Sequence, residues 1–394
     1  MAAEKILMVH NYYQQPGGED ESFRAEMSML KSMGHEVFTY TRSNDQIKVG
    51  GLKNKAGLFL HTVWAQDSYR DITQAIRQHK PDLVHFQNIF PLISPSVYYA
   101  CRKENVPVVQ SLRTYRLICS NGFLFREGKV CEDCMGRFVP LPAVVHACYH
   151  NSRLQSFAVA SMLIFHRTMR TWESQVDRYI ALTEFSRAKF IEAGLSPEKI
   201  VIKPNYIPDP GAGSYPGSYA VFVGRLSPEK GIETLLNAWK LHPEIPLKIV
   251  GKGPLSEFVV EFIQKYQLNI QLIGYLPNQQ VMNVIKGSAF FIFPSIWYET
   301  FGRTIVEAFA CGKPVIASRL GTSLELVKEG QTGRLFHPGD AGDLAEKVSD
   351  LWESVEKRIR LGKNARLVYE TEFTLAKNYD RLYEIYRQVM KRRS

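Results

Sequence analysis

Short apolar runs recur along the first half of the chain and alternate with longer stretches of mixed polarity. Apolar runs of this kind predict buried β-strands. They lie at 5–9, 36–40, 82–86, 106–112 and 179–182. Helical patterns lie between some of them, the first at 19–33. Strands that alternate with helices indicate a parallel, doubly wound sheet of the Rossmann-like kind.

The alternation stops at 207–218, a segment rich in Pro, Gly and Ser, and begins again at Tyr219. Such a segment is typical of a linker. A chain of 394 residues is also too long for one ordinary core. We therefore expect two Rossmann-like domains, at 1–206 and 215–372. Because ligands bind at the carboxyl ends of parallel strands, both lobes should contribute loops to one site in the cleft between them.

The segment 299–307, with the sequence ETFGRTIVE, follows the apolar run at 289–293, which predicts a buried strand. Glu299 then falls in a loop and Glu307 one turn into the next helix. The start of that helix exposes backbone N–H groups that suit a phosphate. They belong to Phe301, Gly302 and Arg303. The two carboxylates could hold sugar hydroxyls, although the same spacing also arises by chance on solvated helices.

A second strand–turn–helix pattern lies at 221–231, with the sequence VFVGRLSPEKG. It brings Arg225 and Lys230 into one turn. Arginine offers a planar fork to phosphate oxygens, and lysine a mobile point charge. A third pattern at 311–318 joins a helix end to a strand. Cations and carboxylates along one edge of a parallel sheet predict binding of a sugar attached to a nucleoside diphosphate.

These segments resemble glycosyltransferase family 4, the retaining nucleotide-sugar transferases of the two-lobed GT-B fold. The matching segments follow the family's order at 224–231, 250–254, 273–275, 294–295, 299–307 and 329–333. The first half matches more loosely, through Gly17-Gly18, 81–86 and 181–186. The resemblance implies an acceptor-binding domain at 1–206 and a donor-binding domain at 215–372. It also implies that a final helix at 373–394 packs back on the first domain.

The resemblance implies same-face transfer of a hexose-type sugar from a UDP- or GDP-sugar to a saccharide or lipid-linked acceptor. Arg225 and Lys230 would then stabilise charge on the leaving diphosphate. Glu299 would hold the hexose and Glu307 the ribose. The remaining donor-binding positions are Gly17, Gly18, Gly224, Gly274, Tyr275, Phe301 and Gly302. This chemistry needs no enzyme nucleophile and no catalytic metal.

One position departs from the family. The strand that ends at Leu112 is usually followed by a histidine that lines the reaction centre, and this chain has Arg113. Arginine is always protonated and cannot act as a base. Arg113 could bind the donor phosphate or an anionic acceptor as a catalytic residue. It could equally mark a weakened enzyme. The four histidines at 10, 35, 85 and 146 have no ligand spacing and are expected to be structural.

Four cysteines fall in one irregular stretch of the first half: Cys119, Cys131, Cys134 and Cys148. The C-x-x-C knuckle and its two flanking thiols could form a tetrahedral structural zinc site. The alternatives are four reduced thiols or a redox pair. Disulfides are not expected in a cytoplasmic protein.

The composition, with 45% hydrophobic and 22% charged residues, is that of a soluble globular protein. A signal peptide and a membrane-spanning run are both missing from the sequence, so we expect the cytoplasm. The net charge of +10 indicates an anionic partner. We favour an anionic membrane face over nucleic acid, for which the chain has no binding motif. A merely basic protein is the alternative.

Three other hypotheses stay open at this point. The stretch 153–172, rich in Ala, Met, Leu and Phe, predicts a long helix. We favour a buried core helix over a membrane- or acceptor-facing one. A phosphorylase or synthase of the same fold is a rival enzyme, and the chain has no lysine motif for pyridoxal phosphate. A catalytically silent nucleotide-sugar-binding protein is a rival of another class, supported only by Arg113.

Overall fold

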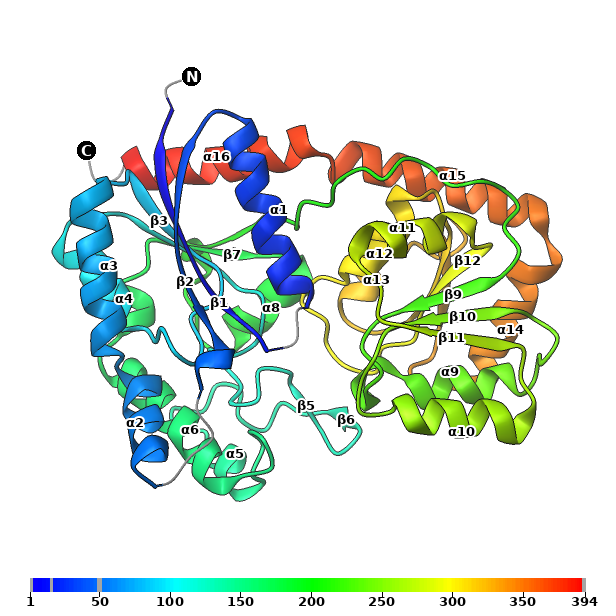
Figure 1. The fold of residues 1–394 in the computed structure, drawn as a ribbon, viewed down its shortest axis with the longest axis horizontal. Coiled ribbons are helices and arrows are strands. Elements are labelled where there is room, and N and C mark those ends of the chain that lie inside the picture. Colours follow the sequence, from blue (N-terminus) through cyan, green and yellow to red (C-terminus); the bar gives the residue numbers. More distant parts are fainter. Residues whose placement is uncertain (1–2, 15–16, 48–51, 392–394) are drawn as a thin grey trace. The chain divides into compact units, whose positions relative to one another are not determined.

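The chain forms two compact units, each built around one parallel β-sheet. The structure is a computed structural model that describes residues 3–14, 17–47 and 52–391. The first unit contains Met1–Leu124, Glu132–Tyr206 and Leu375–Ser394, and the second contains Phe125–Cys131 and Ile207–Thr374. Figure 1 shows a sheet with helices on its faces in each unit. The prediction of two doubly wound α/β lobes is confirmed.

The sheet of the first unit has six parallel strands among the described residues, in the order β2-β1-β3-β4-β7-β8. The strands are β1 (Lys5–Tyr12), β2 (Glu36–Ser43), β3 (Leu83–Phe86), β4 (Val108–Ser111), β7 (Arg178–Ala181) and β8 (Ile200–Ile202). The central strands β3, β4 and β7 are buried throughout, as expected where helices cover both faces. The strand order changes direction between β1 and β3, which makes a topological switch point there.

Helices cover both faces of this first sheet (Figure 1). They are α1 (Gly18–Ser32), α2 (Leu52–Val63), α3 (Gln66–His79), α4 (Ser96–Lys103), α5 (Leu141–Val145), α6 (Arg153–Thr168), α7 (Thr171–Ser174), α8 (Glu184–Glu192) and α16 (Leu375–Lys391). On one face, Ile6, Met8 and Leu83 pack in a core with α1 and α16. The Tyr98 ring of α4 packs against the Phe86 ring of β3, with the ring centres 5.0 Å apart.

The last helix, α16, completes the core of the first unit. Its residues Tyr379, Leu382 and Tyr386 are buried in the same cluster as Ile6 and Met8 of β1. The Tyr379 hydroxyl lies 2.8 Å from His35 Nε2. Figure 1 draws this helix in red beside the blue strands and helix of the chain's beginning. The two ends of the sequence are therefore packed together in one unit.

The sheet of the second unit also has six parallel strands among the described residues, in the order β11-β10-β9-β12-β13-β14. They are β9 (Ala220–Val223), β10 (Leu247–Val250), β11 (Ile270–Gly274), β12 (Phe290–Phe293), β13 (Val315–Ser318) and β14 (Gly333–Phe336). The strand order changes direction between β9 and β12. This switch point is where a doubly wound sheet binds ligands.

The helices of the second unit are α9 (Ile232–Trp239), α10 (Ser256–Tyr266), α11 (Asn278–Gly287), α12 (Arg303–Ala310), α13 (Thr322–Leu326), α14 (Ala341–Glu353) and α15 (Val355–Glu372). Trp239 of α9, Val259 of α10 and Leu344 of α14 share a buried core with Phe290 of the central strand β12. A short hairpin of β5 (Phe125–Arg126) and β6 (Lys129–Val130) groups with this unit.

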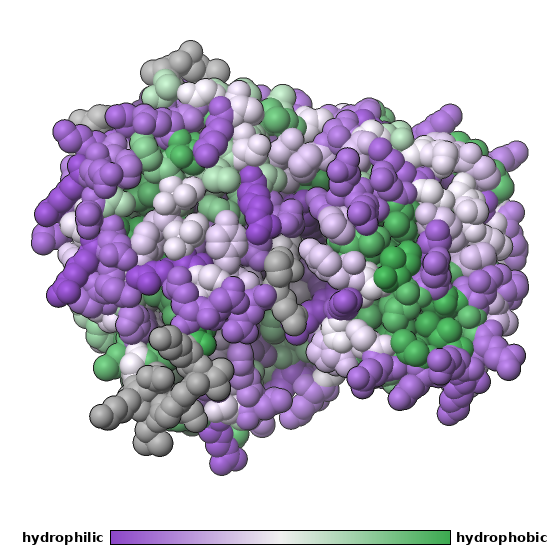
Figure 2. All heavy atoms as spheres, viewed as in Figure 1, coloured by the Kyte–Doolittle hydropathy of each residue, from purple (hydrophilic) through white to green (hydrophobic). Residues whose placement is uncertain are grey.

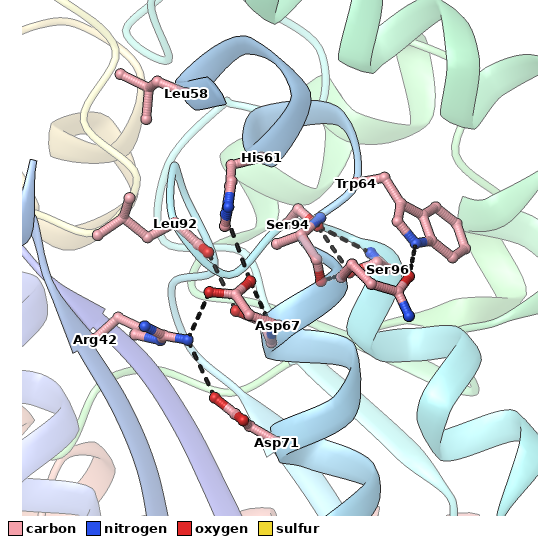
Figure 3. Close-up of polar contacts among 12 residues, drawn as sticks. Arg42, Leu58, His61, Trp64, Asp67, Asp71, Leu92, Ser94 and Ser96 are labelled. Carbon is pink, nitrogen blue, oxygen red and sulfur yellow. Dashed lines mark hydrogen bonds and ion pairs between the residues drawn. The ribbon is translucent and has the colours of Figure 1, made fainter. Parts of the chain in front are cut away.

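Helices α2 and α3 meet in a polar corner at the end of β2 (Figure 3). Arg42 donates to the carboxylates of Asp67 and Asp71 at 2.9 and 3.1 Å. His61 of α2 lies 3.5 Å from Asp67. The backbone N–H of Ala65, between the two helices, donates to Ser94 Oγ at 2.8 Å. These contacts fix the end of α2 against the sheet.

The predicted long helix at 153–172 is divided in the structure. Helix α6 ends at Thr168, and α7 begins at Thr171. Arg170 between them has a left-handed backbone with φ of 51°, which an α-helix cannot contain. Val159 and Leu163 are buried, but Phe157 is 50% exposed. The interpretation as a buried core helix therefore agrees with one face of α6 and is wrong for the other.

Figure 2 shows hydrophilic residues over most of the viewed face, with hydrophobic ones gathered on the second unit. Within the described residues, none of the helices combines the length and the apolar character needed to cross a membrane.

Candidate functional site

The two strand–turn–helix motifs of the second unit come together at its switch point. Strands β9 and β12 pair side by side, and the loop after each carries one motif. Gly231, in the β9 motif, has φ of 69°, and a Cβ there would lie 1.9 Å from the carbonyl oxygen of Pro294. Only glycine allows the two loops to approach this closely. The sequence predicted that the motifs lie along one edge of a sheet, and the pairing of β9 with β12 makes their loops neighbours.

Glu299 is the centre of a compact polar cluster. Lys230 Nζ lies 2.6 Å from Glu299 Oε1. Ser295 Oγ and Trp297 Nε1 both donate to the same oxygen at 2.9 Å. The Lys230 ammonium also lies 5.0 Å from the centre of the Trp297 ring. Three donors on one oxygen fix the carboxylate, and both partners of the ion pair stay partly open, with side chains 22% and 13% exposed.

The loop that carries Glu299 is held by its own neighbours. Thr322, the first residue of α13, donates its hydroxyl to the Glu299 carbonyl at 2.7 Å. Gly302 caps the next helix, α12, with φ of 75°, a conformation that favours glycine. Helix α12 therefore begins at Arg303, four residues after Glu299.

Glu307 lies within α12 and is 4% exposed. Arg303, one turn earlier, donates from Nε to Glu307 Oε1 at 2.8 Å. The sequence analysis assigned the Glu307 carboxylate to a ligand and did not predict its contact with Arg303. The spacing of four residues on a helix is a signal that could have found it. The arginine orients the carboxylate of Glu307.

The other donor-binding positions of the second unit lie around the same edge. Arg225 is exposed, one residue after Gly224. Gly274 ends β11, and Tyr275 after it is 61% exposed. Phe301 is 3% exposed, with its ring 6.1 Å from that of Phe373. A role for Phe301 in a ligand contact would therefore fall to its backbone.

We expect Glu307→Ala to weaken binding of a nucleoside diphosphate about 10-fold or more, because a charged hydrogen bond contributes roughly 1.5–3 kcal/mol. Glu299→Ala should lower the rate of transfer more than nucleotide affinity, since Glu299 is assigned to the sugar. Calorimetry with nucleoside diphosphate alone measures the first effect.

The matched control is Glu370→Ala on α15. Glu370 accepts from Arg366 at 2.7 Å with the same four-residue spacing, and its side chain is 50% exposed. Its loss should leave nucleotide affinity unchanged. Equal loss of affinity in the Glu307 and Glu299 variants would contradict the division of roles.

In the first unit, Gly17 and Gly18 lie where β1 leads into α1. Gly17 is the N-cap of α1 with φ of −135°, an extended backbone that any residue can adopt. A Cβ at Gly17 would meet no described atom within 4 Å. The fold itself thus does not require glycine at this position, and close approach of a ligand stays the predicted reason for it.

Arg113 is 5% exposed and sits inside the first unit. Its Nε donates to Gln87 Oε1 at 2.5 Å, and its Nη1 donates to Asn205. Its Nη2 lies 3.7 Å from Glu26 Oε2. The guanidinium is thus anchored by side chains from α1 and from the segments that follow β3 and β8. These contacts hold the Arg113 side chain in one position. A catalytic role for Arg113 stays a prediction.

The anchor of Arg113 is a buried ionic network that sequence reasoning missed. Glu26 of α1 is 1% exposed and pairs with Lys203, which is also 1% exposed. Glu26 Oε1 accepts from Gln87 Nε2 at 2.7 Å. Burial alone would raise the pKa of Glu26, but the charges of Lys203, His85 and Arg113 lower it to about 2. Glu26 is therefore ionised at neutral pH.

Two further histidines, His85 and His166, stay neutral in the fold. Burial lowers the pKa of each to about 4. His85 lies 2.7 Å from the Tyr386 hydroxyl and 2.9 Å from Ser111 Oγ. His166 lies 2.9 Å from the carbonyl of Val63. The expectation that His85 is structural agrees with these contacts.

The neutral state of His166 predicts acid sensitivity. The unfolded chain takes up a proton on this histidine below its ordinary pKa of 6.5, and the folded chain only below about 4. Stability contributed by the neutral ring is complete above pH 6.5 and is lost as the pH falls toward 4. At pH 5 the loss should be about 2 kcal/mol. Urea unfolding of the wild type and of His166→Gln, from pH 7.5 to 5, measures it.

The difference in unfolding free energy between the wild type and His166→Gln isolates the effect of His166. This comparison is needed because Glu19 titrates in the same pH range and changes the stability in the opposite direction. Desolvation raises the pKa of Glu19 to about 7. His242→Gln is the matched control, since His242 lies on the second unit with its side chain 25% exposed. A stability difference between wild type and His166→Gln that does not change with pH would refute the prediction.

Glu19 is a candidate site residue that sequence reasoning also missed. It is the second residue of α1, directly after the Gly17-Gly18 pair, and the Tyr13 hydroxyl lies 3.4 Å from its carboxylate. Burial raises its pKa to about 7, against the lowering effect of Arg113 and Arg116. A carboxyl group that titrates near neutral pH can accept or release a proton under working conditions.

The four cysteines of the zinc hypothesis differ in exposure. Cys119 and Cys134 are buried, and Cys131 and Cys148 are partly exposed. Across residues 3–14, 17–47 and 52–391, no three His, Cys, Asp or Glu side chains gather in a way that could hold a metal ion. The geometry gives the zinc site no support, and it stays a prediction. Elemental analysis of protein purified without added metal tests it, and one zinc per chain is the expected value.

Two parallel α/β units, one with cations and carboxylates at its switch point, define a nucleotide-binding enzyme of the two-lobed GT-B class. Family models match both parts of the chain: Glycosyltransferase Family 4 at residues 17–209 and Glycosyl transferases group 1 at residues 216–368. An uncharacterized glycosyltransferase of Methanocaldococcus jannaschii is 32% identical over 385 residues, which are 93% of this chain and 93% of that protein. The chain belongs to glycosyltransferase family 4, and it transfers sugar from a nucleotide sugar.

Two further similarities support this assignment. The gpi3 subunit of phosphatidylinositol N-acetylglucosaminyltransferase from Schizosaccharomyces pombe is 25% identical over 354 residues, which are 86% of this chain and 71% of that protein. Among solved structures, that of Anabaena HepE in complex with UDP-glucose has a TM-score of 0.69 at 19% identity. It covers 98% of this chain and 100% of that one, and it shows the GT-B fold.

Proposed function

We propose that this glycosyltransferase moves a hexose-type sugar from a UDP- or GDP-sugar to a saccharide or lipid-linked acceptor, with retention of the anomeric configuration. The observation that carries the proposal is the Lys230–Glu299 pair of 2.6 Å at the switch point of the second unit. A cation for the diphosphate and a fixed carboxylate for the sugar stand side by side there. The solved Anabaena neighbour holds UDP-glucose, which supports the choice of donor class.

In the proposed reaction the acceptor attacks from the face that the diphosphate leaves. The departing phosphate oxygen takes the acceptor proton, so no enzyme nucleophile is required. Arg225 and Lys230 stabilise the charge that develops on the diphosphate. Glu299 accepts hydrogen bonds from the hexose hydroxyls, together with the backbone at Phe301 and Gly302. Because the chain's own cations meet the diphosphate, the proposal uses no catalytic metal.

The second unit is the proposed donor-binding domain. Glu307, oriented by Arg303, is suited to accept hydrogen bonds from the ribose hydroxyls. The backbone at Gly274 and Tyr275 lies at the end of β11, at the strand edge where the base would lie. Exposed Arg225 has room to reach the diphosphate.

The first unit is the proposed acceptor-binding domain. Gly17 and Gly18 leave space at the start of α1, and Glu19 supplies a carboxyl group for an acceptor hydroxyl. Arg113, buried and anchored, would supply positive charge without moving. The name of the Schizosaccharomyces pombe relative is that of an enzyme acting on phosphatidylinositol. This supports a lipid-linked acceptor, and the proposal includes a place at the cytoplasmic face of the membrane that contains it.

The experiment is to incubate the purified protein with a panel of UDP- and GDP-sugars and to follow release of nucleoside diphosphate. The anomeric coupling in the NMR spectrum of the product then gives its configuration. Retention is the expected result. Inversion would overturn the same-face mechanism. Binding of nucleotide sugars without any release or transfer would instead support the catalytically silent alternative.

A further inference from the structure

Helices α2, α5 and α6 of the first unit carry exposed hydrophobic side chains, which we name the apolar face. Leu60 of α2 is 65% exposed. Leu141 and Val145 of α5 are 60% and 53% exposed. On α6, Leu154, Phe157 and Phe165 are 62%, 50% and 39% exposed. Single exposed apolar residues are ordinary, but a group on neighbouring helices marks an interaction surface.

The helical spacing places these side chains on common faces. Leu141 and Val145 are one turn apart, as are Leu154 and Phe157. The opposite side of α6 is buried, with Val159 at 1% and Leu163 at 0% exposure. Helix α6 thus has hydrophobic residues toward the core and toward the outside. An ordinary surface helix has polar residues on its outer side.

The three helices form one surface. Helix α6 packs against both α2 and α5. The Phe59 ring of α2 stacks on the Phe157 ring of α6 with centres 6.0 Å apart. The polar corner in Figure 3 fixes the end of α2 through His61 and Asp67. The apolar face is therefore built on anchored helices.

The segments that form the apolar face contain no carboxylates. Residues 134–172 include no Asp or Glu, and neither do residues 46–66. The first of these segments contains four arginines, of which Arg137, Arg153 and Arg170 are exposed. A protein–protein interface usually has a rim of both signs. A surface rich in cations around hydrophobic side chains is complementary to an anionic bilayer.

A hollow beside the apolar face gathers three of these arginines. It has a volume of about 210 Å³ and is lined in part by Arg137, Phe138, Arg167 and Arg170. Arg167 donates to the carbonyls of Arg137 and Phe138 at 2.5 and 2.9 Å and holds the loop in place. Glu173 also lines the hollow and pairs with Arg170 at 2.6 Å. Phe138 lines the hollow and is itself a hydrophobic side chain that is 56% exposed.

We propose that the apolar face docks the protein on an anionic phospholipid bilayer. The leucine, valine and phenylalanine side chains enter the boundary between headgroups and acyl chains, and the arginines contact lipid phosphates. This placement deepens the proposed function and rests on it, because a membrane-bound enzyme can reach an acceptor that is part of that membrane.

The test is sedimentation of the full-length protein with vesicles of phosphatidylcholine alone and of phosphatidylcholine mixed with phosphatidylglycerol. The wild type should bind the anionic vesicles more tightly, and added salt should weaken this binding. Leu154→Gln/Phe157→Gln should weaken it about 10-fold or more, since each side chain loses its apolar burial in the bilayer. Arg137→Gln/Arg170→Gln should weaken it about 10-fold and remove much of the salt dependence.

The matched control is Leu241→Gln/Leu367→Gln on the second unit, where the two leucines are 60% and 59% exposed. It should bind vesicles like the wild type. Thermal unfolding verifies that all variants fold, and calorimetry with nucleoside diphosphate in the absence of vesicles verifies the donor site. Failure of nucleotide binding in the wild type would refute the proposed function and leave the vesicle result intact.

Vesicle binding that is unchanged by the Leu154/Phe157 variant would overturn the proposal. So would equal binding to neutral and anionic vesicles. A wild-type dimer in solution that this variant converts to a monomer would also overturn it, because the apolar face would then be an interface between copies of the chain.

Discussion

Replacing Lys230 with alanine is expected to lower the rate of sugar transfer by a factor of about 10²–10³, the effect of removing one donor from a developing anion. Lys230 lies at the switch point, with its ammonium 2.6 Å from Glu299 and 5.0 Å from the centre of the Trp297 ring. Its charge is fixed before the diphosphate leaves. The stabilisation therefore requires no rearrangement at the moment of reaction.

The loss should fall on turnover more than on donor affinity. Ser295 and Trp297 still donate to Glu299 in the variant, so the carboxylate stays in place. Steady-state kinetics with varied donor concentration separates kcat from KM. Lys240→Ala is the matched control, since Lys240 also lies over an aromatic ring, 4.2 Å from the centre of Tyr266, outside the site. If the Lys230→Ala variant is folded and transfers sugar as fast as the wild type, the diphosphate does not bind at this turn.

Replacing Glu26 with glutamine is expected to destabilise the protein by about 3–5 kcal/mol, the cost of breaking a buried ion pair. Glu26 and Lys203 are each 1% exposed. The variant leaves Lys203 and Arg113 as buried cations without their common anion. Solvent cannot compensate for this loss, because water does not reach the pair. Urea unfolding at neutral pH measures the change in free energy.

Glu36→Gln is the matched control for Glu26→Gln. Glu36 lies 3.9 Å from Lys5, and the two side chains are 55% and 47% exposed. Solvent screens such a pair, so the loss should stay below about 1 kcal/mol. The double variant Glu26→Gln/Lys203→Met should recover part of the lost stability, since one buried cation is also removed. Similar losses for Glu26→Gln and Glu36→Gln would show that the buried network contributes no more than a surface pair.

The sequence predicted the two sheets and the sheet edge that carries the donor-binding motifs, because both depend on local patterns. Apolar runs such as 289–293 form strands wherever helices cover them, and each motif directly follows such a run. The motifs predicted cations and carboxylates along one edge of a sheet, and the structure shows Lys230 paired with Glu299 there. The division of the chain near residue 206 follows from a change in composition that is also local.

The network around Arg113 could not be predicted in this way. It joins Glu26, Gln87, Lys203 and Tyr386, which come from distant parts of the chain and meet only in the folded first unit. The family resemblance implies a histidine where this chain has Arg113, but a sequence does not show what neutralises the charge of the arginine. The contacts explain how a cation can be held there.

The exposed face of α6 was the less favoured alternative for a different reason. Alanine, leucine and phenylalanine at helical spacing have the same pattern whether the surrounding medium is a protein core or solvent. Only the positions of α2 and α5 decide which face remains open. The end of α6 depends on the left-handed backbone of Arg170, and arginine has no special preference for that conformation.

The packing of α16 in the first unit has a consequence for synthesis. A ribosome makes β1, β3 and β4 well before it makes α16, and the entire second unit emerges in between. Until then Ile6, Met8 and Leu83 lack the helix that covers them. The amino-terminal lobe therefore cannot mature as its residues emerge, although amino-terminal domains usually fold first. The nascent chain must keep an apolar surface shielded, by transient contacts or by chaperones, until α16 has been made.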